Sequence, residues 1–210
     1  MDKAEQIKTE AIKWLLKGNL SFKSNRDAIG TEVLFSVKRR KADLLILSTN
    51  THAIEIKSDF DKLDKLKTQL QDYYNSFDKV SVITTLRHVC NIKKVLSPKA
   101  GLIIFDNASF KVLRKAKRQK RLNKSSLLMF LPKDELTKIY RAPRGQRLSV
   151  TEIRMRIKNQ LNADEIREKA FSHLKKRYRK LFELFLHDTA GIIIWDELRG
   201  LSGKINKLHG

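Results

Sequence analysis

The chain has 210 residues, and its 45 Lys and Arg against 23 Asp and Glu give a formal net charge of +22. This length suits one domain, or one domain with an appendage. The sequence has no apolar run of the roughly 18 residues that a membrane-spanning helix needs, and its charged start is unlike a signal peptide. We therefore expect a soluble cytoplasmic protein. Its one cysteine, Cys90, excludes an intramolecular disulfide and is predicted to be a small core residue.

The positive charge is uneven along the chain. Residues 1–110 carry 19 basic and 13 acidic residues (+6), whereas residues 111–210 carry 26 and 10 (+16). Such an excess predicts a polyanionic partner, and nucleic acid is favoured over a membrane because no strongly apolar amphipathic face accompanies the charge. A basic ribosome-associated protein would share this charge, so charge alone does not decide the function.

The N-terminal part predicts one helix and then strands. A helix is expected over residues 3–17, closed by Gly18, followed by a polar connection over 19–31. The alternation of apolar residues predicts strands over 32–37, 44–47 and 52–57. Lys38, Arg39, Arg40 and Lys41 form a basic turn that would attract a phosphate backbone, although a charged turn is common on any surface.

The second and third predicted strands contain the residues that could form a catalytic site. Asp43 precedes the strand 44–47, while Glu55 and Lys57 share one face of the strand 52–57. An antiparallel hairpin would bring the two carboxylates together, where they could hold a hard divalent cation. A lysine beside them could position or help deprotonate a water molecule. Glu-x-Lys occurs by chance in most soluble proteins, but charges inside an apolar strand are costly to bury without a purpose.

The next helix is expected over residues 61–77, with Ser58, Asp59 and Asp61 supplying its N-cap and first turn. Gln69 and Tyr73 lie four residues apart and are therefore neighbours on its surface. They could reach a bound phosphate, although a surface Gln beside a half-buried Tyr gives the same spacing.

Alternating apolar segments complete the predicted core. Strands are expected over 79–84, 101–105 and 110–113, and a short helix over 89–95. These elements predict an α/β fold with a mixed sheet flanked by helices.

Asp43, Glu55-Ile56-Lys57 and Gln69-x-x-x-Tyr73 together resemble the PD-(D/E)XK nuclease superfamily, in its Q-x-x-x-Y variant. Within it, the segment from residue 55 to 80 is similar to an uncharacterised family of sce-type nuclease-like proteins. The likeness covers about residues 30–180 and is dense from 43 to 88. Lys62 and Lys65 depart from the usual Thr and Arg, and Ala42 stands where the superfamily has Pro.

The resemblance implies a restriction-endonuclease-like fold and a Mg²⁺ site, in which Mn²⁺ could substitute. Asp43, Glu55 and the backbone carbonyl of Ile56 would be the metal ligands, and Lys57 would be the catalytic lysine. Gln69 and Tyr73 would be auxiliary residues. For Glu32, two roles are equally expected: a third acidic member of the site, or an ordinary strand residue.

The C-terminal part, residues 114–210, is predicted to be a basic helical appendage to a core of residues 1–113. Residues 114–124 are rich in cations and lack acids, and Ser149 with Glu152 and Asn162 with Glu165 predict helices over 150–161 and 163–186. A helix over 133–140, a basic link over 141–147, an apolar patch over 191–195 and a last helix over 196–201 are also expected. The nucleic-acid contacts are assigned to the basic turn and to Arg118, Lys120, Arg121, Lys175, Lys176 and Arg177.

Two functions remain open at this point. The first is a Mg²⁺-dependent nuclease, with DNA as the expected substrate and a homodimer as one arrangement. The second is a nucleic-acid-binding module that keeps the nuclease fold without cutting, within a larger assembly. A basic structural protein of an RNA assembly would leave the acidic pair unexplained.

Overall fold

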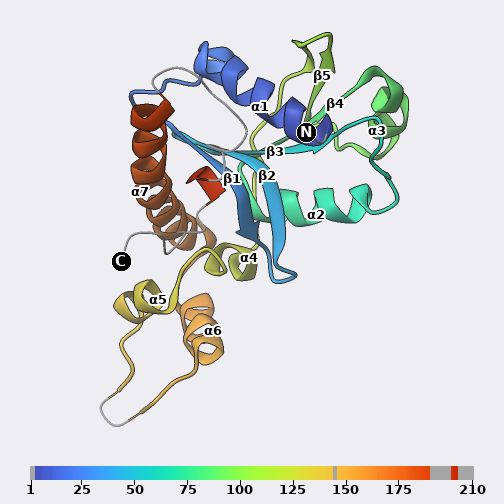
Figure 1. The fold of residues 1–210 in the computed structure, drawn as a ribbon. Coiled ribbons are helices and arrows are strands. Elements are labelled where there is room, and N and C mark those ends of the chain that lie inside the picture. The colour runs from blue at the N-terminus through green and yellow to red at the C-terminus, as the bar shows by residue number, and fades with distance from the viewer. Residues whose placement is uncertain (1–2, 144–145, 190–199, 203–210) are drawn as a thin grey trace.

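The computed structural model describes residues 3–143, 146–189 and 200–202, and it has an α/β fold in which helices flank a mixed sheet (Figure 1). The sheet has six strands in the order β1-β2-β3-β4-β5-β6. The central pairs β3–β4 and β4–β5 are parallel, whereas β1–β2, β2–β3 and β5–β6 are antiparallel. The predicted fold class is therefore confirmed. The strands are β1 (Ala28–Phe35), β2 (Arg40–Leu47), β3 (Thr51–Lys57), β4 (Lys79–Thr84), β5 (Gly101–Asp106) and β6 (Ser109–Arg114).

The central strands are buried because helices cover both faces of the sheet. Every residue of β3 is buried, as are all residues of β4 after Lys79. Each parallel connection passes through a helix, as parallel pairing requires. α2 (Leu66–Ser76) joins β3 to β4, and α3 (Val89–Val95), preceded by the short η2 (Leu86–His88), joins β4 to β5. β4 and α3 match the predicted ranges.

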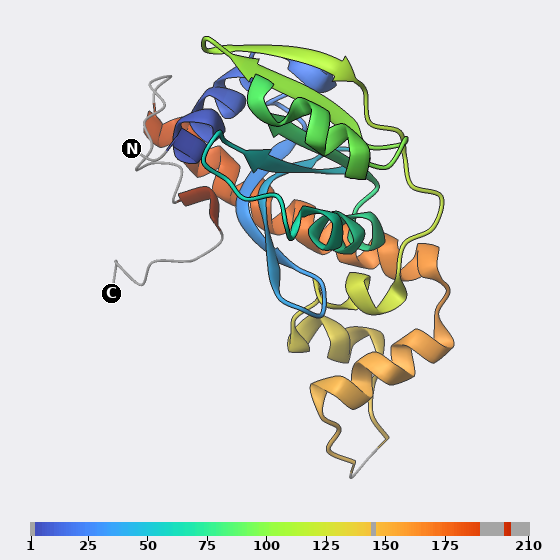
Figure 2. The same ribbon diagram turned by 90° about the vertical axis from the view of Figure 1, so that its right-hand side faces the viewer.

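The first two helices lie on opposite faces of the sheet (Figures 1 and 2). α1 (Lys3–Leu16) covers one face and ends before Gly18, whose φ of 88° lets its N–H bond to the Leu15 carbonyl at 2.9 Å. A short 3₁₀ turn, η1 (Asn19–Ser21), follows it. α2 covers the other face and buries Leu66, Leu70 and Tyr73.

The C-terminal part is helical, as predicted. Its helices are α4 (Lys124–Leu128), α5 (Lys133–Ile139), α6 (Val150–Gln160) and α7 (Ala163–Thr189). The predicted capping box of α6 is present, with the Ser149 hydroxyl accepting from the Glu152 N–H and the Glu152 carboxylate accepting from the Ser149 N–H. Asn162 and Glu165 exchange the same two bonds at the start of α7.

α7 packs along β1 at the edge of the sheet (Figure 1). Gly30 makes this approach possible, because a Cβ there would lie 2.6 Å from the Tyr178 ring. The ring of Phe182 meets that of Phe22 edge-on with centroids 5.7 Å apart. The Arg179 guanidinium donates to the backbone oxygens of Ser24 and Asp27. The division between residues 113 and 114 stays a prediction, and this packing crosses it.

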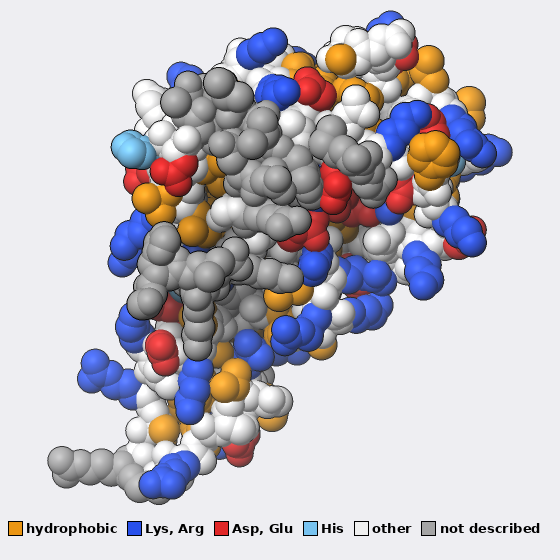
Figure 3. Space-filling view, viewed as in Figure 1, with side chains coloured by type: hydrophobic (Ala, Val, Ile, Leu, Met, Phe, Trp, Pro, Cys, Tyr) orange, Lys and Arg blue, Asp and Glu red, His pale blue; other side chains and the backbone are white. Residues whose placement is uncertain are grey.

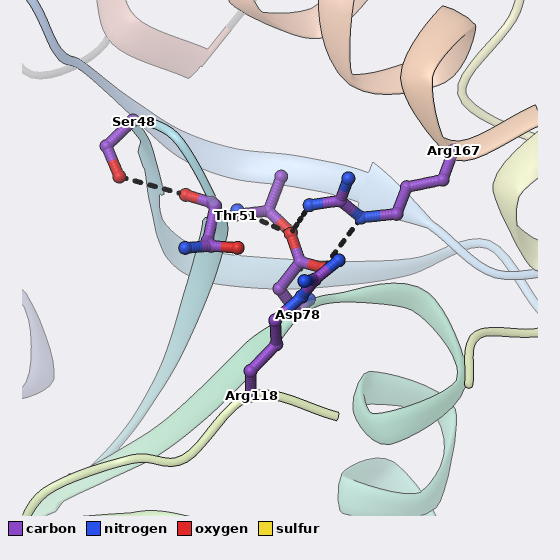
Figure 4. Close-up of polar contacts among 6 residues, drawn as sticks. Ser48, Thr51, Asp78, Arg118 and Arg167 are labelled. Carbon is purple, nitrogen blue, oxygen red and sulfur yellow. Dashed lines mark hydrogen bonds and ion pairs between the residues drawn. The ribbon is translucent and has the colours of Figure 1, made fainter. Parts of the chain in front are cut away.

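Asp78 makes a second connection across that division (Figure 4). Its carboxylate is fully buried and accepts two hydrogen bonds of 2.8 Å from the Arg167 guanidinium of α7. It also accepts from the N–H of Thr51 at 2.9 Å, and Arg118 lies 3.5 Å away. The buried carboxylate is thus satisfied by groups from three separate segments.

Several predicted boundaries were wrong. β1 begins at Ala28 rather than at residue 32, because residues 28–31 (AIGT) are buried and paired with residues 44–47 of β2. α2 begins at Leu66 rather than at residue 61, since the carboxylate of Asp61 accepts from the N–H and hydroxyl of Ser58 and holds a turn there. Cys90 is exposed, not in the core. The apolar patch over 191–195 and most of the helix over 196–201 lie outside the described residues.

Among the helices that the structure describes, none is long and apolar enough to span a bilayer.

Candidate active site

Asp43 and Glu55 meet where the pairing of β2 with β3 stops. The last hydrogen-bonded partners are Leu44 and Ile54, so Asp43 and Glu55 stand opposite each other one step further along. Instead of the ladder, the carboxylate of Asp43 accepts a hydrogen bond of 2.7 Å from the N–H of Ile56. The predicted convergence of the two acids on adjacent strands is therefore present in the structure.

Glu55 is held from two sides. Its Oε1 lies 2.7 Å from Nζ of Lys57, and its Oε2 accepts from the hydroxyl of Tyr73 on α2. The side chains of Glu55 and Lys57 are only 4% and 10% exposed. Burial alone would lower the pKa of Lys57, but the charges of Glu55 and then Asp43 outweigh it and raise the pKa. Lys57 is therefore a fixed ammonium at neutral pH.

The pKa of Asp43 is raised to about 7. The largest cause is the loss of surrounding water, and the second is the negative charge of Glu55. The charges of Lys8 and Lys57 act in the opposite direction without cancelling these effects. The same surroundings raise the pKa of Tyr73 well above its ordinary value, again mainly through burial. The positive charges of Lys8 and Lys57 do not offset the effects of burial and of the neighbouring carboxylate on Asp43. The surroundings of the two carboxylates therefore favour an added cation.

Glu32 lies beside the site but is engaged by two lysines. Its carboxylate contacts Nζ of Lys8 at 2.5 Å and Nζ of Lys41 at 3.4 Å. Burial alone would raise the pKa of Glu32, but these two lysines together lower it. Its role as a third acidic member of the site stays a prediction.

Lys8 of α1 is the member of this cluster that sequence reasoning missed. Only 7% of the residue is exposed, and its charge acts on Asp43 as well as on Glu32. A signal was available, because Lys8 shares its helix face with the buried Ile12 and Leu15 at the spacing of a core stripe. A lysine in such a stripe needs a partner at the end of its chain.

The backbone is distorted next to Asp43. Glu32 has a φ of 49°, which is uncommon for a residue with a side chain. The β1–β2 ladder passes from Thr31–Leu44 to Val33–Ala42 without pairing Glu32 to Asp43. Strain of this kind persists only where surrounding contacts impose it, and it is frequent at functional sites.

The auxiliary residues occupy different positions. Tyr73 is fully buried and reaches both Glu55 and, at 3.3 Å, the carbonyl oxygen of Lys41. Gln69 is half-buried one turn earlier on α2, and its assignment stays a prediction. Tyr73 belongs to the core of the protein, whereas the next residue, Tyr74, is only half-buried.

The predicted nucleic-acid contacts fall into two kinds. Some cations are engaged within the protein: Arg40 and Lys38 pair with Asp72, Lys41 with Glu32, and Arg118 with Asp78. Arg39, Lys120, Arg121, Lys176 and Arg177 are exposed, although Arg177 also lies over the Tyr178 ring at 5.7 Å, and Lys175 is half-buried. Figure 3 shows Lys and Arg side chains spread over the lower part of one face, where α5 and α6 lie.

The described residues contain no group of three or more His, Cys, Asp and Glu side chains arranged to hold a metal ion. The predicted ligand set uses two carboxylates and the backbone carbonyl of Ile56. It therefore does not depend on such a group.

Fold and site together define an α/β protein with a mixed sheet and a buried cluster of carboxylates and lysines at one end of β3. The chain belongs to the family of bacteriophage P4 protein cII, whose model matches residues 2–202. Protein cII of Enterobacteria phage P4 is 33% identical over 196 residues, covering 89% of this chain and 72% of that protein. The solved SPO1766 protein of unknown function from Silicibacter pomeroyi is 18% identical and covers 60% of this chain and 86% of its own, with a TM-score of 0.37. That likeness is too low to carry an argument about fold or function.

Proposed function

We propose that the protein is a Mg²⁺-dependent nuclease of the PD-(D/E)XK type that hydrolyses phosphodiester bonds, with DNA as its substrate. The supporting observation is the buried cluster in which Lys57 contacts Glu55 while Asp43 stands opposite on β2. A structural ion pair needs one carboxylate, whereas this cluster holds two against each other. Burial, and then the charge of Glu55, raises the pKa of Asp43, so keeping both carboxylates ionised in this cluster is unfavourable.

The donor set fits a hard divalent cation. Asp43, Glu55 and the carbonyl oxygen of Ile56 offer the oxygen ligands that Mg²⁺ and Mn²⁺ take. Bound there, the ion would supply Lewis-acid stabilisation of the charge that develops on the phosphate. A dication would also relieve the repulsion between the two carboxylates, which supports the assignment on electrostatic grounds.

The chain's own residues have separate roles in this proposal. Lys57 orients the attacking water and stabilises negative charge with an ammonium held in place by Glu55 and Asp43. Tyr73 fixes the carboxylate of Glu55 through its hydroxyl. Lys8 and Lys41 hold Glu32 away from the pair formed by Asp43 and Glu55. The exposed cations supply the electrostatic attraction for the substrate backbone.

The alternative function is a nucleic-acid-binding module that does not cleave. The observation in its favour is that the carboxylate of Glu55 already has two partners, Lys57 and Tyr73. A cluster satisfied in this way could serve stability alone, and cleavage separates the two functions directly.

The test is cleavage of plasmid and single-stranded DNA by the wild type and by Lys57→Ala, with Mg²⁺, Mn²⁺ or EDTA. Lys62→Ala is the matched control, since it removes the same charge from an exposed position close in sequence. We expect the wild type and Lys62→Ala to cleave with either metal and not with EDTA. Lys57→Ala should bind DNA like the wild type and fail to cleave.

Lys57→Arg should also fail, because a guanidinium does not give up its proton and does not fit a compact ammonium site. The catalytic assignment of Lys57 would be refuted by a Lys57→Ala protein that melts, binds and cleaves like the wild type. A wild type that binds DNA but never cleaves it with either metal would favour the binding module.

The contribution of the C-terminal half to DNA affinity needs surface variants rather than truncation, because α7 is packed on β1. Replacing Lys120, Arg121 and Lys176 by Gln should lower the affinity and reduce the slope of log K against log salt by about 0.9 per lost phosphate contact. An unchanged slope would contradict the predicted contacts.

A further inference from the structure

A polar pocket lies on the face of the sheet opposite the cluster formed by Asp43, Glu55 and Lys57. Side chains alternate along β3, so that Glu55 and Lys57 point to one face and His52 to the other. His52 lines a pocket of about 330 Å³ beneath the end of α1 and η1. This volume lies at the lower end of the range for small-molecule sites, roughly 300–1,000 Å³.

A buried hydrogen-bonded pair forms the floor of the pocket. His52 Nε2 lies 2.7 Å from the Ser81 hydroxyl on β4, and the two residues are 9% and 1% exposed. Gly101 on β5 makes room for this hydroxyl, because a Cβ there would lie 2.2 Å from it. Burial, and then the charge of Lys79, lowers the pKa of His52 to about 3. The imidazole is therefore neutral and can both donate and accept.

The walls of the pocket are cationic and aromatic. Lys79, Arg114 and Lys115 line it, and its lining, all within the described residues, includes no Asp or Glu. Arg114 is fixed by hydrogen bonds to the backbone oxygens of Ala100 and Ser97. Trp14 is fixed by stacking on Phe110 with ring centroids 4.9 Å apart. An anionic group and a flat ring are the complementary ligand features.

The rim beside Trp14 is held in an unusual conformation. Leu20 and Ser21 have φ values of 53° and 61°, and both line the pocket. The side-chain amide of Asn19 donates to the carbonyl oxygen of Trp14 at 2.7 Å, which fixes this turn to the end of α1. Two consecutive left-handed residues with side chains are costly, and such costs are concentrated at ligand sites.

We propose that this pocket binds a nucleoside phosphate. The phosphate would lie against Lys79, Arg114 and Lys115, and the base would lie against Trp14. His52, oriented by its contact with the Ser81 hydroxyl, would offer a hydrogen bond to the polar edge of the base. Ser81 is too deeply buried to act as a nucleophile. The ligand is either a free mononucleotide or the phosphorylated terminal nucleotide of a nucleic acid. The site lies on the other face of the sheet and does not rest on nuclease activity.

The test is calorimetric titration of the full chain with purine and pyrimidine nucleoside monophosphates, the matching nucleosides and inorganic phosphate. At least one monophosphate should bind ~10-fold or more tightly than its nucleoside and than phosphate alone, since each half of the ligand makes contacts of its own. Lys115→Gln should weaken binding by ~10-fold, the loss expected for one charge-assisted hydrogen bond. Lys93→Gln is the matched control, because this exposed lysine neither lines the pocket nor belongs to the predicted nucleic-acid contacts, and binding should be unchanged.

Trp14→Leu should also weaken binding, and the melting temperature of this variant reports whether the fold survives. Oligonucleotides with and without a terminal phosphate distinguish the two sources, because only a strand-end site would prefer the phosphorylated oligonucleotide over the free monophosphate. The proposal would be overturned by the absence of binding at millimolar concentrations, by phosphate binding as tightly as every nucleotide, or by equal losses in Lys115→Gln and Lys93→Gln.

Discussion

The most informative stability experiment removes the carboxylate of Asp78, which joins α7 to the start of β4. Asp78→Ala leaves the Arg167 guanidinium, with its side chain only 20% exposed, without its two acceptors at 2.8 Å. It also leaves the buried N–H of Thr51 without an acceptor. Removing one partner of a buried ion pair costs about 3–5 kcal/mol. We expect a loss of about 4 kcal/mol, which is a large part of a typical unfolding free energy of ~5–15 kcal/mol.

The reciprocal change, Arg167→Ala, should cost less, about 3 kcal/mol. Arg118 already lies 3.5 Å from Asp78 and can compensate in part. Because each single change removes the same ion pair, the double variant should cost about 2 kcal/mol less than the sum of the two single effects.

Urea denaturation followed by circular dichroism measures these free energies. Asp106→Ala serves as the control, since Asp106 is exposed at the end of β5 and its loss should change stability by no more than about 0.5 kcal/mol. The reasoning would be refuted if Asp78→Ala lost less than about 1 kcal/mol, or if the two single effects simply added.

Three further predictions concern single residues. Because the pKa of Asp43 rises from 3.8 to about 7 on folding, its neutral form favours the folded state below pH 4 and this contribution is lost as the pH rises through 7. Thermal melts should therefore show Asp43→Asn to be more stable than the wild type at pH 8, by up to about 4 kcal/mol for about three pKa units at 1.36 kcal/mol each, and an equal difference at pH 4 and pH 8 would contradict this. Tyr73→Phe should cost about 1.5–3 kcal/mol in denaturant, the worth of a buried hydrogen bond to a charged group, and a neutral effect would show that the hydroxyl does not hold Glu55. Gly30→Ala should cost about 1–3 kcal/mol, because its Cβ would lie 2.6 Å from the Tyr178 ring, and the added change Tyr178→Leu should recover part of that loss.

Much of the fold could be predicted because it depends on local patterns in the sequence. The apolar run over Lys79–Thr84 and the short helix Val89–Val95 have bounds that neighbouring residues set, and the structure matches them. The capping boxes at Ser149 and Asn162 likewise act over three residues. The convergence of Asp43 and Glu55 followed from the register of a hairpin, which is also local.

The remainder depends on contacts between distant parts of the chain. The pairing of Lys8 with Glu32, and the approach of Lys8 to Asp43, require the position of α1 over the sheet. The early start of β1 depends on β2, because residues 28–31 include a glycine, which strands disfavour, and are held in the sheet by their pairing with residues 44–47. Asp78 and Arg167 are 89 residues apart, so no local pattern could pair them.

Because α7 docks on β1, the N-terminal strand cannot be covered until the C-terminal helix has been synthesised. The Arg179 guanidinium bonds to the carbonyl oxygen of Ser24, 155 positions earlier in the chain. At synthesis rates of about 5–20 residues per second, β1 would wait roughly 8–30 s for the helix that covers it. During that interval the apolar surface that α7 covers, which includes Phe22, stays exposed, and other chains can associate with it. We expect a ribosome-bound chain that stops before α7 to associate with chaperones and to aggregate after release.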